Sequence, residues 1–335
     1  MGTILGPSYP RRCAKLGSVM RVHGAGQWAP EAQETVGRLT RRFASWTFGE
    51  EPPTDTEVWV GPGFSAEHGR RLPRLRAVVV PWAGPSRELV EQVRSVPGVS
   101  LHNLHHNADA TTEMAVALLL AVAKSVAPRD RAMRQGDWGG RGRASSALLL
   151  RGSTALVLGY GAIGRRIARV CRALGMRVLA VRREARAGDP AWVHPVARLK
   201  EFLPEADALL CSLPLTEETR GLIGSREIEL LPERAIVVNV GRGPVFDEDA
   251  LYEALSTGRL WGAGLDVWWQ YPSGEPPNWP SRRPFHELEN VVLTPHCGGW
   301  AEGIDEVRFR ELARLLRRFA VGDWTANAVD LARGY

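Results

Sequence analysis

The chain has 335 residues, of which 44% are hydrophobic and 24% are charged. This is the composition of a globular protein with one large or two ordinary domains, and no apolar run reaches the roughly 18 residues that a membrane span requires. The formal net charge is +6, so charge alone would admit a nucleic acid or an acidic lipid surface as a partner. Composition therefore argues against a membrane protein and leaves the partner to be decided by where the charge lies.

The excess positive charge is confined to one segment. Residues 139–200 carry 13 basic side chains against only Glu184 and Asp189, a local charge of +11, whereas the remaining 30 basic and 35 acidic side chains sum to −5. The segment has neither the aromatic residues interleaved with arginine that bind single strands nor a helix-turn-helix or finger pattern. We therefore expect a local anionic ligand and no nucleic-acid partner.

The cysteines and the N-terminus indicate the cellular setting. Cys13, Cys171, Cys211 and Cys297 are scattered, without a C-x-x-C pair or a metal-like spacing to the histidines, which predicts a reduced, cytoplasmic protein with no metal site. The first residues lack the apolar core of a signal peptide. We expect residues 1–19 to form a loose tail.

The following part, from residue 20 to about residue 100, alternates short apolar runs with helical patterns. Residues 58–60 and 77–80 are predicted strands, and residues 31–42 and 86–94 are predicted helices. A strongly apolar helix is predicted over residues 111–124, with Thr112 as its cap. Its apolar surface requires another domain or another subunit to pack against.

A dinucleotide-binding pattern begins at residue 154. An apolar strand over residues 155–158 runs into Gly159-x-Gly161-x-x-Gly164, an amphipathic helix follows, and a second apolar strand covers residues 178–181. In such a βαβ unit the glycines permit a tight turn and close approach of a pyrophosphate to the helix N-terminus. Because strand, turn and helix stand in the required order, the pattern predicts a dinucleotide site.

The end of the second strand indicates the type of cofactor. An NAD site has an acidic residue there to bind the ribose 2′-OH, whereas an NADP site has arginine for the 2′-phosphate. This chain has Arg182-Arg183, and the first carboxylate is Glu184. We expect NADP(H) to be preferred over NAD(H); the alternative is that both arginines are solvated.

Four more apolar strands, over residues 208–213, 235–240, 263–267 and 291–294, complete a doubly wound parallel sheet. Ligands bind at the carboxyl ends of such strands. Arg242 follows the second of these strands, Asp266 lies at the end of the third, and His296 follows the fourth. A charged arginine and a lone histidine at strand ends are predicted to be functional.

Five motifs give the chain a family resemblance from residue 20 onwards: residues 156–164, 213–223, 238–243, 264–267 and 293–296. On these motifs it resembles the D-isomer-specific 2-hydroxyacid dehydrogenases. The resemblance implies an α/β protein of two domains, in which a Rossmann-type doubly wound sheet, residues 104–298, is inserted in a flavodoxin-like substrate domain, residues 20–103 and 299–335. It implies hinges near Asn103 and Gly299, an active site in the cleft, and an arm over residues 111–138 that pairs two nucleotide domains in a homodimer.

The resemblance also assigns roles to individual residues. Substrate binding is assigned to Trp82, Ala83, Gly84 and Arg242. Cofactor binding is assigned to Thr111, Gly159, Gly161, Ala162, Ile163, Gly164, Arg182, Arg183, Pro214, Thr219, Val240, Gly241, Arg242, Asp266, His296 and Gly298. Asp266 resembles the residue that orients the nicotinamide carboxamide.

The expected chemistry is transfer of a hydride between NAD(P)H and a 2-oxo acid. His296 has the near-neutral pKa of a general acid for the developing alkoxide, and Arg242 is a fixed cation for carboxylate and carbonyl oxygens. The expected substrates resemble glyoxylate or hydroxypyruvate, or are bulkier aromatic 2-oxo acids. A group of tryptophans, Trp82, Trp268, Trp269, Trp279 and Trp300, either packs an interface or lines a wide pocket for an aromatic substrate.

One departure from the family pattern concerns the partner of the histidine. The family places a glutamate five residues after the aspartate, where it raises the pKa of the histidine; this chain has Tyr271 there, preceded by Gln270. Gln270 and Tyr271 are therefore candidate catalytic residues, and Glu275 or Glu302 are candidate partners for His296. We expect a lower pKa for His296 than is usual in the family.

The missing glutamate leaves two other functions open. One is a dehydrogenase for a small oxyanion such as formate or phosphite, because formate dehydrogenases of this superfamily have glutamine at that place. The other is a non-catalytic NAD(P)-binding protein similar to the co-repressors of the superfamily. The substrate is in every case a small anionic molecule.

Overall fold

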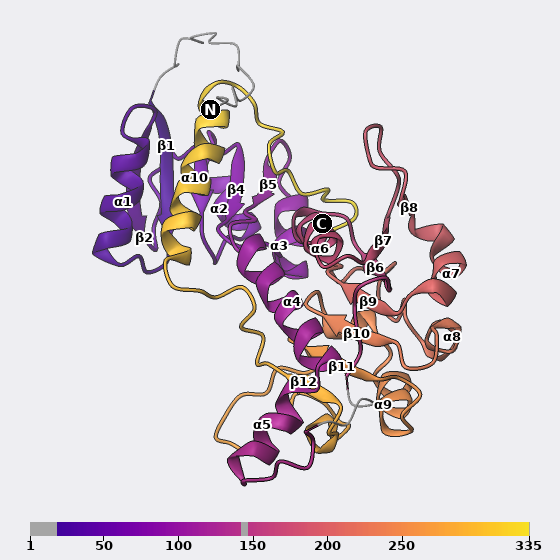
Figure 1. Ribbon diagram of the computed structural model, residues 1–335. Coiled ribbons are helices and arrows are strands. Elements are labelled where there is room, and N and C mark those ends of the chain that lie inside the picture. Colours follow the sequence, from indigo (N-terminus) through magenta and orange to yellow (C-terminus); the bar gives the residue numbers. More distant parts are fainter. Residues whose placement is uncertain (1–18, 142–146, 335) are drawn as a thin grey trace, which may run out of the picture. The chain divides into compact units, whose positions relative to one another are not determined.

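The computed structural model describes residues 19–141 and 147–334 and divides the chain into two compact units (Figure 1). The first unit comprises the chain up to His106 and from Asp305 onwards, and the second unit is Asn107–Ile304. The junctions expected near Asn103 and Gly299 therefore fall a few residues further along the chain. The expected N-terminal tail lies, apart from Val19, outside the described residues.

The first unit is built on a five-stranded parallel sheet with the order β2-β1-β3-β4-β5. Alternate residues of β3 face opposite sides: Val58 and Val60 pack with helix α10, whereas Trp59 packs with α3. Helices α1 and α10 thus cover one side and α3 the other. The strands are β1 (Met20–Ala25), β2 (Ala44–Gly49), β3 (Val58–Val60), β4 (Ala77–Val80) and β5 (Ser100–Asn103), and the helices are α1 (Pro30–Thr40), α2 (Ala66–Arg71), α3 (Arg87–Arg94) and α10 (Ile304–Ala320).

The second unit is built on a seven-stranded parallel sheet with the order β12-β11-β10-β9-β6-β7-β8. The chain passes from β6 outwards through β7 and β8, then returns to β9 on the other side of β6, which makes the sheet doubly wound with a switch point between β6 and β9. The predicted α/β fold class is confirmed. The strands are β6 (Thr154–Leu158), β7 (Arg177–Arg182), β8 (Val193–Pro195), β9 (Ala208–Cys211), β10 (Ile236–Asn239), β11 (Gly262–Leu265) and β12 (Val291–Leu293).

Helices cover both faces of this second sheet. Buried side chains of α4 and α6 pack on one face, and those of α7, α8 and α9 pack on the other. Both faces are therefore closed to water, as is usual for parallel sheets with crossover helices. The helices are α4 (Ala108–Ala123), α5 (Val126–Arg134), α6 (Ala162–Ala173), α7 (Leu199–Phe202), α8 (Ser225–Leu230) and α9 (Glu248–Ser256).

The apolar helix α4 differs in two details from the helix predicted over residues 111–124. It begins at Ala108, and Thr112 is not its cap, because the Thr112 hydroxyl donates to the Ala108 carbonyl at 2.7 Å within the helix. Its apolar side packs on the unit's own sheet, so closely that a Cβ on Gly264 of β11 would lie 2.6 Å from Leu118 Cβ. Much of its apolar surface is thus covered without a second subunit.

Among residues 19–141 and 147–334, no single helix is long and apolar enough to cross a bilayer. Taken together, α4 and α5 reach that length and composition, but they are bent by 65° relative to each other.

Candidate active site

The glycine-rich turn after β6 has the shape of a dinucleotide cradle. Gly159 has a φ of +95°, and a Cβ on Gly164 would lie 1.7 Å from the Gly159 carbonyl oxygen, so both positions require glycine. A Cβ on Gly161 would instead project into open space. Gly161 precedes α6 without a side-chain cap, which leaves the N–H groups of the first turn available to an anion. The residues present therefore fit a pyrophosphate.

The two arginines at the end of β7 differ in their contacts. Arg182 Nη1 donates to both carboxylate oxygens of Asp189 at 3.0 Å, and both side chains are largely buried. Arg183 Nε lies 3.2 Å from the more exposed carboxylate of Glu218. Arg182 is thus committed to a buried ion pair, whereas the pair formed by Arg183 is open to water and easily exchanged.

Arg242 is carried on a tight turn after β10. The Asn239 side chain shapes this turn, since its Oδ1 accepts from Gly241 N and its Nδ2 donates to Arg242 O, both at 3.0 Å. The neighbouring backbones approach closely: a Cβ on Gly243 would lie 2.3 Å from the Trp268 carbonyl carbon. The turn is therefore held rigidly beside the loop that follows β11, and Arg242 is half-buried.

His296 lies in a strained loop after β12. Its φ is +56°, in the left-handed region that non-glycine residues adopt rarely and mostly at functional sites. Asp266, which is 2% exposed, fixes this loop: its Oδ1 accepts from Thr294 Oγ1 at 2.6 Å and from Cys297 N at 3.0 Å, and its Oδ2 accepts from Gly298 N at 3.0 Å.

The strand order brings these three residues together. β10, β11 and β12 are neighbours in the sheet, so Arg242, Asp266 and His296 stand at adjacent carboxyl ends. His296 is an exposed residue, but partial burial of its ring and the positive charge of Arg242 lower its pKa, and the charge of Asp266 partly opposes this. The imidazole is thus held near a fixed cation and a buried carboxylate.

Tyr271, and not a carboxylate, contacts the ring of His296. The two ring centroids are 5.4 Å apart with an interplanar angle of 46°. Gln270 is exposed, and its backbone N–H donates to the Pro280 carbonyl at 3.0 Å. The other candidate partners, Glu275 and Glu302, are both exposed side chains.

The remaining predicted cofactor residues of the second unit lie around the same strand ends or on α4. Thr111 is a buried residue of α4 whose hydroxyl donates to Asn107 O at 2.9 Å. Thr219 Oγ1 donates to Pro214 O at 2.7 Å, closing the turn after β9. Val240 is buried and donates its N–H to Cys211 O at 3.0 Å. Ala162 and Ile163 form the first turn of α6 beside the cradle.

Apart from Arg242, the residues predicted to bind the substrate belong to the first unit. Trp82, Ala83 and Gly84 follow β4, and their loop is held by Leu104 N, which donates to Trp82 O at 3.2 Å, and by Asn103 Nδ2, which donates to Ala83 O at 2.6 Å. Trp82 is 39% exposed. Their role stays a prediction.

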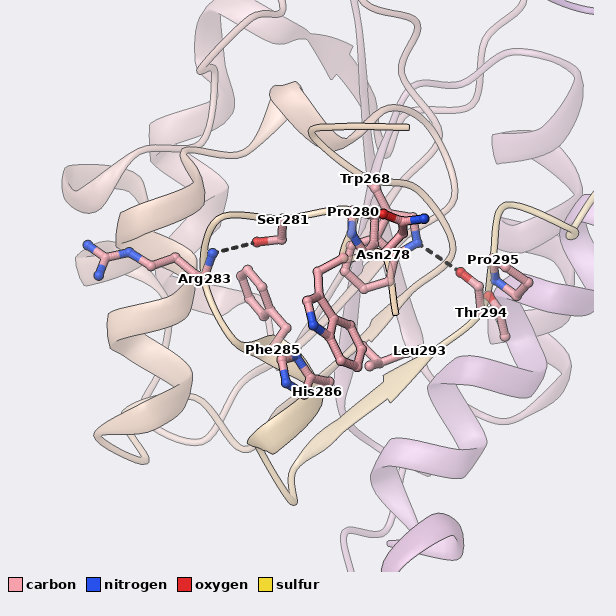
Figure 2. A pocket seen from close by; sticks show the side chains of 11 residues that line it. Trp268, Asn278, Pro280, Ser281, Arg283, Phe285, His286, Leu293, Thr294 and Pro295 are labelled. Atoms are coloured by element: carbon pink, nitrogen blue, oxygen red, sulfur yellow. Dashed lines mark hydrogen bonds between the residues drawn. The ribbon is translucent and has the colours of Figure 1, made fainter. Parts of the chain in front are cut away.

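A cavity of about 240 Å³ lies next to the histidine loop, between the segment 278–286 and the end of β12 (Figure 2). Trp268, Trp279, Leu293 and Pro295 are among its lining residues. Trp269 does not line the cavity. Its ring stacks on that of Phe285, with the two ring centroids 5.3 Å apart. Trp268 and Trp279 thus line the cavity, whereas Trp269 packs against a neighbouring aromatic ring.

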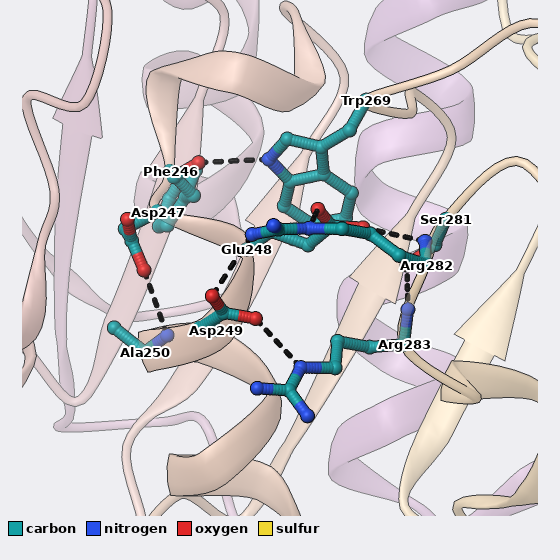
Figure 3. Close-up of polar contacts among 9 residues, drawn as sticks. All are labelled: Phe246, Asp247, Glu248, Asp249, Ala250, Trp269, Ser281, Arg282 and Arg283. Carbon is teal, nitrogen blue, oxygen red and sulfur yellow. Dashed lines mark hydrogen bonds and ion pairs between the residues drawn. The ribbon is translucent and has the colours of Figure 1, made fainter.

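The segment that forms the cavity wall is fastened by a group of contacts that the sequence did not predict (Figure 3). Glu248, buried at the start of α9, accepts from Ser281 Oγ at 2.6 Å, from Arg282 N at 2.9 Å and from Arg282 Nε at 2.6 Å. Arg282 and Arg283 also pair with Asp249. The interacting residues are far apart in the sequence, so no spacing pattern signals them.

The fold and these strand-end residues define a dinucleotide-binding α/β oxidoreductase. The family model for the D-isomer specific 2-hydroxyacid dehydrogenase, NAD binding domain, matches residues 116–298. The glyoxylate reductase of Aeropyrum pernix is 36% identical over 276 residues, 78% of each chain, and that of Thermococcus gammatolerans is 36% identical over 231 residues, 66% of each chain. The chain belongs to the D-isomer specific 2-hydroxyacid dehydrogenase family.

Solved structures agree with this assignment. A D-isomer specific 2-hydroxyacid dehydrogenase from Xanthobacter autotrophicus Py2, solved with NADPH and MES, superposes with a TM-score of 0.77 at 25% identity and covers 95% of this chain and 100% of its own. The protein is therefore an oxidoreductase with a nicotinamide cofactor.

Proposed function

We propose that the protein reduces a small 2-oxo acid of the glyoxylate or hydroxypyruvate type to the D-2-hydroxy acid, with NADPH as the preferred donor. The observation that carries the proposal is the placement of Arg242, Asp266 and His296 at the adjacent ends of β10, β11 and β12, in the unit that also holds the glycine cradle. The two glyoxylate reductases that align with most of the chain support the choice of substrate.

The chain's own residues have distinct tasks in this reaction. The bound nicotinamide supplies the hydride. Arg242 binds the substrate's carboxylate or carbonyl oxygen and stabilises the negative charge that develops there. His296, protonated on its ring, donates the proton that converts the alkoxide to a hydroxyl group. Asp266 orients the nicotinamide carboxamide and keeps the histidine loop in place.

The preference for NADPH is assigned to Arg183. Arg182 is occupied by Asp189, whereas Arg183 can exchange the exposed carboxylate of Glu218 for a 2′-phosphate. A guanidinium bound to phosphate forms charge-assisted hydrogen bonds. The neighbouring Glu218 would weaken the preference by competing for the same cation.

The architecture implied by the family completes the proposal. The first unit is the substrate domain, with Trp82, Ala83 and Gly84 binding the substrate carboxylate. Residues 111–138 form the arm of a homodimer; Val126, Met133 and Trp138, all in this part of the chain, are exposed apolar side chains. A cytoplasmic location remains a prediction.

The test is a spectrophotometric panel of glyoxylate, hydroxypyruvate, pyruvate and phenylpyruvate, each with NADPH and NADH. We expect the highest kcat/KM for glyoxylate or hydroxypyruvate with NADPH. Oxidation of formate or phosphite without turnover of any 2-oxo acid would replace this function with that of a small-oxyanion dehydrogenase. Tight cofactor binding without any turnover would indicate a non-catalytic binding protein.

A second candidate is reduction of an aromatic 2-oxo acid, which the cavity beside His296 favours. Its apolar wall includes Trp268, Trp279 and Leu293, and its volume is about 240 Å³; such an apolar wall suits an aromatic ring. Phenylpyruvate would then have the highest kcat/KM in the panel, and Trp279→Ala would lower it for phenylpyruvate more than for glyoxylate.

A further inference from the structure

We propose that Tyr271 is the positioning residue of His296: its ring holds the imidazole in the orientation for proton transfer, in the place where the family has a carboxylate. The proposal rests on the proposed function, in that it concerns the general acid of that reaction. The glutamate that the family has as the partner of this histidine is replaced here by Tyr271.

The rings of Tyr271 and His296 are in direct contact. The centroids of the tyrosine and histidine rings are 5.4 Å apart, and the interplanar angle is 46°. This tilted arrangement is within the range of favourable aromatic pairs. Tyr271 is held in this position by a local turn, because its hydroxyl oxygen accepts from Trp268 N at 3.4 Å. The ring that contacts His296 is therefore anchored at its far end by its own chain.

The loop that carries Tyr271 is also hydrogen-bonded to the segment after β12 that carries the histidine. Trp268 Nε1 donates to the carbonyl of Thr294 at 2.9 Å, two residues before His296. Trp269 Nε1 donates to Phe246 O at 2.9 Å, and the Glu248 contacts fasten the far end of the loop at Ser281 and Arg282. Hydrogen bonds thus connect the loop that carries Tyr271 with the segment that carries His296.

Hydrogen bonds fix the backbone around His296 but not the orientation of its ring. Asp266 fixes the backbone on both sides of the histidine through Thr294, Cys297 and Gly298, but these bonds leave rotation about the side-chain torsions free. No hydrogen bond to the imidazole is formed by residues 19–141 and 147–334. Among these residues, packing against Tyr271 is the aromatic contact that restricts the ring.

The charge pattern around the pair distinguishes a phenol from a carboxylate. The groups that act on His296 are Arg242 from the end of β10, Asp266 from the end of β11 and Tyr271 from the loop after β11. Tyr271 is itself close to Arg242 and Asp266. Its side chain is 57% exposed, and the partial burial of the hydroxyl raises its pKa from an already alkaline ordinary value, so the phenol stays neutral. A neutral partner positions the ring without favouring its protonated form, whereas a carboxylate would do both.

The experiment compares Tyr271→Leu, Tyr271→Phe and Tyr271→Glu by steady-state reduction of glyoxylate and hydroxypyruvate with NADPH between pH 5 and pH 9. We expect Tyr271→Leu to lose about tenfold to a hundredfold in kcat, because misplacing a catalytic group by about an ångström has effects of this size, with an unchanged Kd for NADPH. Tyr271→Phe, which keeps the ring but loses the hydroxyl oxygen that accepts from Trp268 N, should recover part of the loss. Tyr271→Glu should move the alkaline limb of kcat/KM to higher pH by about one unit.

The matched control is Gln270→Glu, which adds the same charge one residue earlier, on the exposed neighbour. The alkaline limb of its kcat/KM profile should move less than that of Tyr271→Glu. An unchanged kcat in Tyr271→Leu, or an equal shift in both glutamate variants, would overturn the proposal.

A second readout does not depend on turnover. The pKa of His296, measured by NMR on ¹³C-histidine-labelled protein and assigned with His296→Gln, should rise in Tyr271→Glu. If wild-type protein binds NADPH but reduces no 2-oxo acid while this pKa still responds to Tyr271→Glu, the proposed function fails and the ring contact stands. If the pKa does not respond, the positioning proposal fails whatever the substrate.

Discussion

Asp266 Oδ2 accepts the backbone N–H of Gly298 at 3.0 Å, in a space so narrow that a Cβ on Gly298 would lie 2.6 Å from that same oxygen. With both oxygens bonded to residues around His296, this carboxylate supports the left-handed backbone of the histidine. The proposed general acid at the end of β12 is thus held by a buried anion at the end of β11.

The first prediction concerns Asp266→Asn. The amide keeps the shape but replaces one accepting oxygen with a donor, so that the N–H of Cys297 or Gly298 loses its partner. A buried unsatisfied donor costs about 1–3 kcal/mol, and we expect a loss of that size in the free energy of unfolding, measured with urea. Since the charge of Asp266 raises the pKa of His296, the alkaline limb of kcat/KM for reduction should also move to lower pH.

Thr294→Val is the matched control for this prediction. It removes a donor to Asp266 Oδ1 but leaves the charge and both backbone bonds in place. It should reduce stability without moving the pH limb. Equal pH profiles for Asp266→Asn and the wild type would show that the carboxylate does not act on the histidine.

The second prediction is the pH dependence of the wild-type enzyme. The general acid must be protonated for reduction, and the pKa of His296 is lowered from its ordinary value of 6.5, first by burial and then by Arg242. Reduction should therefore be fast at acidic pH and fall as the pH rises through this lowered pKa, whereas oxidation of the hydroxy acid should rise over the same interval. The measurement is kcat/KM in both directions; a reductive profile that stays flat to pH 9 would contradict it.

His296→Ala should abolish that pH dependence together with most of the activity. Loss of a general acid costs on the order of 10²–10⁴ in rate. The Kd for NADPH should change little, because the glycine cradle and Arg183 are untouched. Wild-type turnover in this variant would remove His296 from the mechanism.

The third prediction separates two glycines of the cradle. Gly161→Ala should fold normally, since its Cβ meets nothing within 4 Å, yet it should weaken cofactor binding at least tenfold because the methyl group enters the space proposed for the pyrophosphate. Gly164→Ala should fail to fold stably, since its Cβ would overlap the Gly159 carbonyl. Thermal unfolding with and without NADPH distinguishes the two outcomes, and unaltered cofactor affinity in Gly161→Ala would place the phosphates elsewhere.

Which parts of the fold and of the candidate site could be predicted from the sequence depends on how far apart in the chain the interacting residues are. The cradle and the positions of Arg242, Asp266 and His296 were predictable because each follows an apolar strand that is local in the sequence. Strand β1 was not predicted, since it contains His23, a polar residue that is fully buried. Its ring nitrogens are satisfied by Thr47 Oγ1 at 3.0 Å and Gly49 O at 3.1 Å on or at the end of β2, partners that no local pattern reveals.

The contact of Tyr271 with His296 has the same origin. The departure from the family motif marked Tyr271 and Gln270 equally, and only the path of the loop after β11 decides which one lies beside the histidine. That path is determined by Trp268, which binds Thr294 O, and by Glu248, which binds Ser281 and Arg282. Interactions that join distant segments are set by tertiary packing, so residue spacing carries no signal for them.

The fourth prediction tests the Glu248 contacts shown in Figure 3. Glu248→Ala leaves the Ser281 hydroxyl and the Arg282 N–H without their acceptor in a buried place, so the free energy of unfolding should fall by about 1–3 kcal/mol. The more exposed Asp249, whose pairs with Arg282 and Arg283 lie in water, supplies the control, and Asp249→Ala should have a smaller effect. A larger loss in Asp249→Ala would mean that the outer ion pairs, not the buried carboxylate, hold this segment.

The fifth prediction assigns cofactor preference between two adjacent arginines. Arg183→Ala should lower kcat/KM with NADPH about tenfold, the effect of one charge-assisted hydrogen bond, and leave NADH nearly unchanged. Arg182→Ala should instead reduce thermal stability and affect both cofactors alike, because it deprives the largely buried Asp189 carboxylate of its guanidinium. Glu218→Gln should strengthen the preference for NADPH by freeing Arg183. If Arg182→Ala alone abolished the preference in a stably folded protein, the 2′-phosphate would bind Arg182 in exchange for Asp189.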